Sequence, residues 1–423
     1  MTRPSMATAS GARAGTASDA IVGRMPANVV EPATLDEATE IVGACARDRA
    51  HLAFAGGRTE LGLGAAPEQL DVLLRTTALS RIVEHAPLDQ IVTVECGARI
   101  GDVQRALAAH GQRLALDPPW ADRATVGGVI ASNAFGALRT RYGSVRDLII
   151  GISFVRADGA RVRGGGKVVK NVAGFDLPKL LTGSLGTLGL IATATFRLHP
   201  LPETATTVVF PRIALADVQR VLRAAREAHL EPEAVAALAS APASADWQLG
   251  IRFAGFARGV ADQTARLREA VNKIDIAIAM EAENAGAFWD AHERARARDA
   301  AIRIKVALLP ADPGATELVG RIAAPLRDAR AIFYPTLGLG FVTGGSGAGD
   351  ADAIAAAIEA ARRTLAVTGG SVVVHDAPAP LRARLDVWGV ADGPRSAVPL
   401  MRNLKQRLDP ERRLAPGRFV AGL

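Results

Sequence analysis

The chain has 423 residues, which is long enough for two domains, and its 49% hydrophobic content supports ordinary globular cores. Its formal net charge of +7 would suit an acidic partner, an anionic membrane surface or nucleic acid, but basic and acidic residues are interspersed and no recognised nucleic-acid motif accompanies them. Cys45 and Cys96 lie far apart without a Cys-x-x-Cys partner, which excludes a disulfide framework or an iron–sulfur site within this chain and fits a reducing, cytosolic compartment.

The stretch up to residue 24 is rich in Ala, Ser, Thr and Gly and lacks the apolar core of a signal peptide. We therefore predict a flexible tail over residues 1–24. Apolar runs elsewhere fall well short of the length that a membrane-spanning helix needs.

Residues 25–202 mix helical and extended patterns. A capping box at residues 34–37 precedes a helical stripe of apolar residues. Strands are predicted over residues 51–55, 71–75 and 91–95, a helix over residues 100–107, and a hairpin where residues 148–155 and 160–163 flank Asp158-Gly159. The mixture predicts an α+β domain, and the Gly-x-Gly-x-x-Gly of a doubly wound nucleotide fold does not occur in it.

Three glycine-bearing blocks punctuate this region, at residues 55–62, 124–133 and 183–189. Each combines glycines, which let backbone amides approach a ligand, with Ser, Thr or Asn side chains that donate to phosphate or ring oxygens. A surface turn would explain one such block. Three blocks, each beside an apolar strand-like run, indicate a dinucleotide site.

The glycine blocks stop after His199-Pro200-Leu201-Pro202, so we place a domain boundary there. Strands are predicted beyond it over residues 206–210, 247–253, 301–309, 331–342 and 371–375, and helices over residues 215–228 and 352–365. This pattern predicts an antiparallel sheet covered by helices. Residues 344–349 lack the Lys-Ser/Thr of a phosphate loop, so we predict a flexible connection there.

The order and the amino-acid sequences of the glycine blocks resemble those of the FAD-binding domain in the p-cresol methylhydroxylase and vanillyl-alcohol oxidase superfamily, over roughly residues 25–202. The motifs are at residues 54–59, 125–128, 132–133 and 141–147. Residues 169–176 and 183–189, together with the ending at residues 408–410 and 416–419, resemble more narrowly the FAD-binding E subunits of bacterial glycolate oxidases.

The resemblance implies an α+β fold with a two-part FAD-binding domain, an α+β cap domain and a C-terminal helix that returns to the FAD domain. We therefore predict a tail over residues 1–24, the FAD-binding domain over residues 25–202, the cap over residues 203–395 and a returning segment over residues 396–423.

The resemblance also implies which residues bind FAD. They are Ala55, Gly56, Gly57, Arg58, Thr59, Glu60, Thr125, Gly127, Gly128, Ser132, Asn133, Gly136, Tyr142, Asn171, Gly183, Gly186, Gly189 and Ile191. Arg58 would add a positive charge beside the pyrophosphate, although a solvated loop arginine is the alternative. Some members of the superfamily attach FAD through a histidine in the first loop. No histidine lies between His51 and His85 here, so we predict non-covalent binding.

Oxidation of a 2-hydroxy acid needs a cation for the carboxylate and a base for the hydroxyl proton. Relatives with this activity carry clustered histidines, often around a metal, but the seven histidines here show no metal-ligand spacing and we predict no metal site. His375 is the candidate base and Arg303, with Lys305 on the same face of its strand, the candidate cation. A hydrogen-bonded structural histidine and a solvated or partner-covered strand face are the alternatives.

A flavin site beside an incomplete substrate site fits an FAD-binding subunit of a glycolate oxidase complex, working with a homologous catalytic D subunit and an iron–sulfur F subunit to turn glycolate into glyoxylate. The alternatives are a self-contained FAD-dependent 2-hydroxy-acid dehydrogenase and a non-catalytic assembly subunit. We expect a cytoplasmic protein held at the inner face of the cell membrane through its partners.

Overall fold

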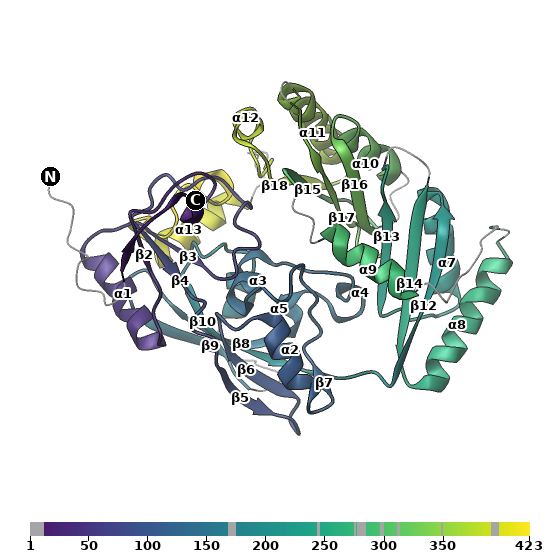
Figure 1. The fold of residues 1–423 in the computed structure, drawn as a ribbon, viewed down its shortest axis with the longest axis horizontal. Helices are drawn as coiled ribbons and strands as arrows, with labels where there is room; N and C mark the ends of the chain where they lie inside the picture. The colour runs from purple at the N-terminus through teal and green to yellow at the C-terminus, as the bar shows by residue number, and fades with distance from the viewer. Residues whose placement is uncertain are drawn as a thin grey trace. The chain divides into compact units, whose positions relative to one another are not determined.

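The computed structural model describes residues 12–167, 175–242, 246–274, 276, 285–296, 300–310, 314–347, 350–390 and 397–423 (Figure 1). The chain divides into two compact units. The first unit consists of residues 1–136, 143–200 and 390–423, and the second of residues 137–142 and 201–389. Each unit is described below by itself.

The first unit contains two main sheets. In the smaller one the order is β1-β2-β4-β3, with β2, β4 and β3 parallel, and in the larger, antiparallel one it is β5-β6-β10-β8-β9. The strands are β1 (Arg13–Ala14), β2 (Asn28–Val30), β3 (Leu52–Ala55), β4 (Val72–Arg75), β5 (Ile82–Ala86), β6 (Ile91–Glu95), β7 (Gln112–Arg113), β8 (Ile149–Val155), β9 (Arg161–Gly165), β10 (Leu190–Arg197) and β11 (His199–Pro200).

Two helices of the first unit begin at threonine caps. Thr34 accepts from the amide of Glu37 at 3.2 Å, which is one half of the predicted capping box, while the Glu37 carboxylate accepts from the amide of Ala33 instead of Thr34. Thr125 caps the second helix through the amide of Gly128. The helices are α1 (Leu35–Arg47), α2 (Ile100–Ala108), α3 (Val126–Ser132), α5 (Val145–Leu148), α6 (Leu177–Leu181) and α13 (Val398–Leu408), with 3-10 turns η1 (Ala17–Asp19) and η2 (Val420–Gly422).

Regular structure is present before residue 24, inside the segment that was predicted to be a flexible tail. Strand β1 pairs with β2, and η1 follows it. The reason is Asp19, a buried carboxylate that accepts two hydrogen bonds from Arg13, at 2.6 and 2.8 Å, and one from the hydroxyl of Thr16. These hydrogen bonds lower the pKa of Asp19 well below its usual range. Small polar residues gave no sign of this anchor in the sequence.

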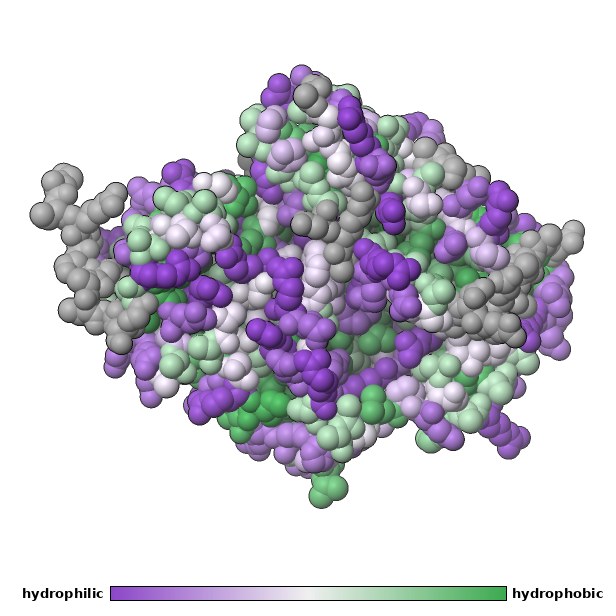
Figure 2. Space-filling model, viewed as in Figure 1, coloured by the Kyte–Doolittle hydropathy of each residue, from purple (hydrophilic) through white to green (hydrophobic). Residues whose placement is uncertain are grey.

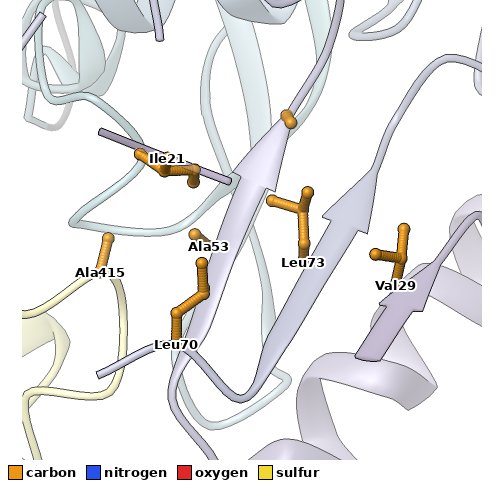
Figure 3. Close-up of a cluster of buried hydrophobic side chains, with 7 residues drawn as sticks. Ile21, Val29, Ala53, Leu70, Leu73 and Ala415 are labelled. Atoms are coloured by element: carbon orange, nitrogen blue, oxygen red, sulfur yellow. The ribbon is translucent and has the colours of Figure 1, made fainter. Parts of the chain in front are cut away.

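A buried apolar cluster joins both ends of the described chain to the parallel sheet (Figure 3). Ile21 from the N-terminal segment and Ala415 from the C-terminal segment lie beside Ala53 on β3, and Leu73 on β4 continues the cluster toward Val29 on β2. These side chains are at most 3% exposed, so their packing fixes both segments on the sheet.

The C-terminal segment returns to the first unit, as predicted. Its backbone extends the parallel sheet beyond β3, because the amide of Leu52 donates to the carbonyl of Arg413 at 2.8 Å and the amide of Ala415 donates to the carbonyl of Leu52 at 2.9 Å. The edge of β3 is thereby covered.

The ammonium of Lys405, in α13, is buried, and its hydrogen bonds hold the C-terminal segment on the first unit. It donates to the carboxylate of Asp409 at 2.7 Å, to the carbonyl of Thr187 at 2.8 Å and to the carbonyl of Leu414 at 2.9 Å. Asp409 accepts in addition from the amides of Arg413 and Leu414. Burial lowers the pKa of Lys405, and Asp409 opposes that shift.

The second unit is built on one antiparallel sheet of order β12-β14-β13-β16-β17-β15-β18, as the alternation predicted. The elements are β12 (Thr204–Ile213), β13 (Ala234–Ala239), β14 (Trp247–Gly255), β15 (Ile302–Ala307), β16 (Arg327–Tyr334), β17 (Leu339–Gly345), β18 (Ser371–Asp376), α4 (Arg139–Tyr142), α7 (Leu215–Glu227), α8 (Ala257–Asn272), α9 (Ala285–Arg296), α10 (Ala315–Ala323), α11 (Ala351–Ala366) and α12 (Ala379–Arg382). Helix α8 packs on β12 and β14, α10 on β16 and β17, and α11 on β18.

Two predicted segments of the second unit differ from the structure. The single strand predicted over residues 331–342 is two strands, β16 and β17, joined by a turn in which Gly338 has φ of 63°. A Cβ there would lie 2.0 Å from the carbonyl oxygen of Leu308, so the turn requires glycine. Of the predicted connection at residues 344–349, the first two glycines belong to β17, and residues 348 and 349 lie outside the described residues.

Hydrophilic and hydrophobic residues are intermixed on the face drawn in Figure 2, in keeping with the interspersed charges of the sequence. Among the residues that the structure describes, no helix combines the length and the apolar character needed to cross a bilayer.

Replacing Lys405 with Met should leave the Asp409 carboxylate buried without its countercharge. We expect the free energy of unfolding of the first unit to fall by about 3–5 kcal/mol. Urea denaturation followed by circular dichroism, with hydrogen exchange at β3, measures the change. The matched control is Lys179→Met, which removes the lysine of an exposed pair with Asp176 in the same unit and should cost less than about 1 kcal/mol. Equal losses in the two variants would contradict the role given to Lys405.

Candidate functional site

The first glycine block follows β3 and presents backbone donors without partners. The amides of Gly56, Gly57, Arg58 and Thr59 donate no hydrogen bond within the described part of the chain. All four residues are only partly buried. A run of consecutive unpaired N–H groups forms a concave site for an anion.

Close packing of protein on protein explains why this block needs its glycines. A Cβ at Gly57 would lie 1.7 Å from the carbonyl oxygen of Arg123, and one at Gly56 would lie 2.0 Å from the hydroxyl of Thr125. The first and second glycine blocks are therefore in direct contact. The sequence pattern indicates that these glycines let a ligand approach, and in the structure they also let two loops meet.

The second block forms the start of α3 and differs from the first. Thr125 accepts from the amide of Gly128 at 3.4 Å, and the amide of Gly127 donates to the carbonyl of Cys96 at 2.7 Å. These amides are already used within the protein. Gly128 is exposed, and a Cβ there would meet only the Thr125 hydroxyl, at 3.2 Å, with open space otherwise. Gly128 thus contributes an uncovered backbone surface.

The third block forms hydrogen bonds with the C-terminal end of α3. The amide of Gly183 donates to the carbonyl of Ile130, and the amide of Leu185 donates to the carbonyl of Ala131, both at 2.9 Å. Gly186 has φ of 75°, which glycine adopts readily. The carbonyls at the C-terminal end of α3 are thereby satisfied, and the helix is held against the first block.

Two adjoining pockets lie between the three blocks within the first unit, and they share six lining residues, Phe54, Ala55, Gly56, Gly128, Ala131 and Leu185. The predicted cofactor residues that line them are Ala55, Gly56, Gly57, Arg58, Thr59, Glu60, Thr125, Gly127, Gly128, Ser132, Gly186, Gly189 and Ile191. Asn133, Gly136, Tyr142 and Gly183 are not among the lining residues, and Asn171 lies outside the described residues.

Other lining residues were missed by the sequence analysis, namely Ile21, Ala53, Phe54, Leu61, Thr76, Cys96, Ala131, Leu185, Leu190, Ala415 and Arg418. Leu61, Ala131 and Leu185 lie inside the three glycine blocks but have no polar side-chain group, and most of the others are apolar residues of ordinary strand patterns. Arg418 lies in the Pro-Gly-Arg-Phe ending that the resemblance had singled out, so its motif was visible although its place was not. Burial raises the pKa of the Cys96 thiol to about 12, so this residue adds no negative charge to the pocket at neutral pH.

Two polar atoms near the pockets are buried without a hydrogen-bond partner among the described residues. They are Oδ1 of Asn133, at the end of α3, and Oγ of Ser184, in the third block. Unsatisfied buried polar atoms are rare and need an explanation. Asn133 and Ser184 are not among the lining residues, so the ligand signal of this site rests on the four open amides, which fit a cofactor that carries an anionic group.

The side chain of Arg58 is shared with the N-terminal segment. Its guanidinium donates to the carbonyl of Ser18 and lies 4.0 Å from the carboxylate of Asp19. Asp19 is already paired with Arg13, so one carboxylate faces two guanidiniums and one positive charge remains beside the pocket. Arg58 lines that pocket, and its role in holding the cofactor stays a prediction.

Tyr142 belongs to the second unit, where its hydroxyl lies 3.1 Å from the carboxylate of Glu233 and donates to it. Glu233 is fully buried, and the guanidinium of Arg252 lies 3.2 Å from its other oxygen. A role for Tyr142 in holding the cofactor stays a prediction.

The two predicted catalytic residues lie on neighbouring strands of the second unit and are both buried. Arg303 on β15 donates through Nε to the carboxylate of Asp376 at 2.8 Å. His375 on β18 makes an edge-to-face contact with the ring of Phe341, with centroids 5.5 Å apart. Lys305 is partly buried, two residues beyond Arg303. The described residues contain no group of three or more His, Cys, Asp or Glu arranged to hold a metal ion.

His292, on α9, is buried. Its Nε2 lies 3.0 Å from the hydroxyl of Tyr334, and Nδ1 lies 3.4 Å from Glu293. The ring also packs edge to face against Trp289. Burial lowers the pKa of His292 to about 4. The His-Glu pair in the sequence gave no sign of this packing.

Comparison with known proteins identifies a family for residues 26–165 and solved structures with the same fold. Residues 26–165 match the family described as FAD binding domain. The solved structure of p-cresol methylhydroxylase with substrate bound superposes with a TM-score of 0.73 at 16% identity, covering 93% of this chain and 88% of that one. Alkyldihydroxyacetonephosphate synthase superposes with a TM-score of 0.71 at 16% identity, covering 94% of this chain and 78% of that one.

Curated relatives match the chain in part. Glycolate oxidase subunit GlcD of Bacillus subtilis is 35% identical over 44% of this chain and 39% of its own length. D-lactate dehydrogenase of Archaeoglobus fulgidus is 35% identical over 47% of this chain and 45% of its own length. Glycolate oxidase subunit GlcE of Escherichia coli is 37% identical over 29% of this chain and 35% of its own length. The match spans less than half the length of each relative.

Replacing Gly128 with Val should fill the exposed wall of the pocket without a backbone clash. We expect the variant to fold and its bound FAD to fall at least tenfold, as measured by flavin absorbance after gel filtration. The matched control is Gly43→Val on α1, where the added Cβ would meet only the tip of Arg47, at 3.5 Å. Full flavin content in the Gly128 variant would contradict the assignment. Gly57→Val is unsuitable because it clashes with backbone.

The lowered pKa of His292 predicts acid sensitivity of the second unit. The unfolded chain binds a proton near the ordinary value of 6.5, whereas the folded chain does so near 4. Stability should therefore be full above pH 6.5 and fall on the way to pH 4, by up to about 1.4 kcal/mol per pH unit. Urea denaturation between pH 6.5 and 5 measures the slope, and His292→Gln should flatten it. An unchanged slope in that variant would refute the explanation.

Proposed function

We propose, from the FAD-binding domain that residues 26–165 form, that this chain is the FAD-binding redox subunit of a glycolate oxidase complex. In this proposal, glycolate is oxidised to glyoxylate, and electrons pass to an iron–sulfur F subunit. A homologous FAD-linked D subunit is the second partner. The proposal rests on a contrast between two sites. The backbone amides around Gly57 have no partner in the described part of the chain, so they can bind a cofactor. Arg303, the candidate cation for the substrate, already donates to Asp376.

The cofactor part of the proposal rests on the first unit. The amides of residues 56–59 would neutralise the pyrophosphate, and Gly128 would let the cofactor approach α3. The first block contains no histidine to attach a flavin, which supports non-covalent binding. Bound FAD supplies the two-electron oxidation of a CH–OH group, and the chain supplies binding, orientation and charge balance.

The need for a partner rests on the second unit. Glycolate oxidation requires a cation for the carboxylate and a base that takes the hydroxyl proton as hydride leaves the α-carbon. The guanidinium of Arg303 faces a protein carboxylate, and His375 is buried against Phe341. We therefore infer that a homologous subunit holds the substrate, while this chain holds a flavin. Partners would also account for attachment to the inner face of the membrane.

A self-contained FAD-dependent 2-hydroxy-acid dehydrogenase is the second candidate. Arg303 lies opposite Asp376 in the β15–β18 register, beside His375, so a modest rearrangement would bring a cation and a base together. The similarity to D-lactate dehydrogenase favours this candidate. A non-catalytic assembly subunit is the third, and it would carry no flavin.

Purification of the chain alone separates the three candidates. We expect yellow protein that releases FAD on acid precipitation, because the binding is non-covalent. We also expect dye reduction with glycolate or D-lactate to be slow until D and F subunit homologues are added. Turnover by the chain alone at the rate of the assembly would replace the subunit proposal with the dehydrogenase. In that case Arg303→Ala should weaken substrate binding and His375→Ala should slow proton abstraction.

Colourless protein that takes up no added FAD would support the assembly subunit instead. Flavin that remains attached after acid would contradict non-covalent binding. Gly43→Val serves as a control for the purification, because it lies on α1 and away from both pockets.

A further inference from the structure

A cavity of about 480 Å³ lies wholly within the second unit. Its walls come from α4, from α7, from the loop at residues 230–232 that precedes β13, from Pro310 beyond β15 and from the turn between β16 and β17. A cavity of this size falls in the range of small-molecule pockets. None of the residues in the two cofactor pockets of the first unit belongs to it.

Part of the cavity wall is apolar. Leu222, Ala225 and Leu230 line it and are each at most 7% exposed, and three prolines complete the apolar surface. These side chains would gain little from contact with a bare inorganic ion. They favour an occupant with a carbon chain or ring.

The polar part of the wall carries donors without acceptors. The amide nitrogen Nε2 of Gln219 is buried and has no hydrogen-bond partner among the described residues. The side chain of Arg226, seven residues further along α7, is exposed and makes no hydrogen bond or ion pair within that same part of the chain. Leaving the buried donor of Gln219 unsatisfied is costly, so an acceptor belongs beside it, within reach of the Arg226 charge.

The remaining charges leave the wall positive. Arg141 lines the cavity, donates to the carbonyl of Glu231 at 3.3 Å and lies 3.7 Å from the carboxylate of that residue. This ion pair balances the charge of Arg141 with that of Glu231, which is the acidic residue among those that line the cavity. The guanidinium of Arg226 is then the uncompensated charge, and the hydroxyls of Thr140 and Thr336 already bond each other, at 3.2 Å.

We propose that the second unit binds a small organic carboxylate in this cavity, with its carboxylate held by Arg226 and Gln219 and its carbon body against Leu222 and Leu230. The ligand is larger than a two-carbon hydroxy acid, because the cavity holds far more than that. This site is distinct from the flavin pockets, so it goes beyond the redox function proposed above.

The test uses the full chain saturated with FAD and two probes of equal carbon length, sodium hexanoate and hexanamide. Isothermal titration and thermal shift should detect hexanoate, with hexanamide at least tenfold weaker because it lacks the charge. Arg226→Gln and Gln219→Leu should each weaken hexanoate at least tenfold. The matched control is Arg223→Gln, an exposed arginine of α7 that does not line the cavity, and it should bind as the unchanged protein does.

Three outcomes would overturn the proposal. They are no binding of hexanoate, equal binding of hexanoate to the Arg226 variant and the unchanged chain, and tighter binding of inorganic phosphate than of hexanoate. Flavin absorbance is recorded in every titration. A chain that keeps its flavin but ignores hexanoate refutes this site alone, and a chain without flavin refutes the redox proposal without touching this one.

Discussion

The buried ammonium of Lys405 is the interaction on which the first unit depends. Its three acceptors come from three places: the third glycine block, the turn after α13 and the segment that runs beside β3. A buried lysine is tolerated only when each of its donors has a partner. The same ion pair therefore fixes the segment at residues 413–415, and that segment covers β3, the strand that delivers the chain into the open amides at Gly56. The shape of the cofactor pocket follows from a contact outside it.

The sequence was informative where chemistry leaves a local pattern. Glycine with Ser, Thr or Asn beside apolar runs located the loops that meet around one pocket, and alternation of strands and helices predicted the antiparallel sheet of the second unit. Contacts between distant residues left no such pattern. Arg13 and Asp19 form an ion pair within the stretch that was predicted as a flexible tail, and the packing of His292 against Tyr334 likewise has no local sequence signal. Apolar lining residues outside the glycine blocks, such as Leu190, could not be predicted because they resemble any core residue.

The two units differ in the polar groups at their candidate sites. In the first, the amides of residues 56–59 are left without protein partners, which is costly unless a ligand satisfies them. In the second, the candidate substrate cation Arg303 already donates to Asp376, although the buried donor of Gln219 in a separate cavity has no partner among the described residues. A chain arranged in this way is prepared to hold a cofactor and less prepared to hold a small hydroxy acid unaided. The proposed division of labour between subunits would give that asymmetry a physical reason.

The pairing of β3 with residues 413–415 has a consequence for biosynthesis. Leu52 emerges from the ribosome long before Arg413 and Ala415, so β3 has no neighbour on that side during most of translation. Contacts of such wide sequence separation form slowly, because a long loop must close first. Loading of the flavin is therefore a late event, and a ribosome that stalls before residue 413 would release a chain unable to retain it.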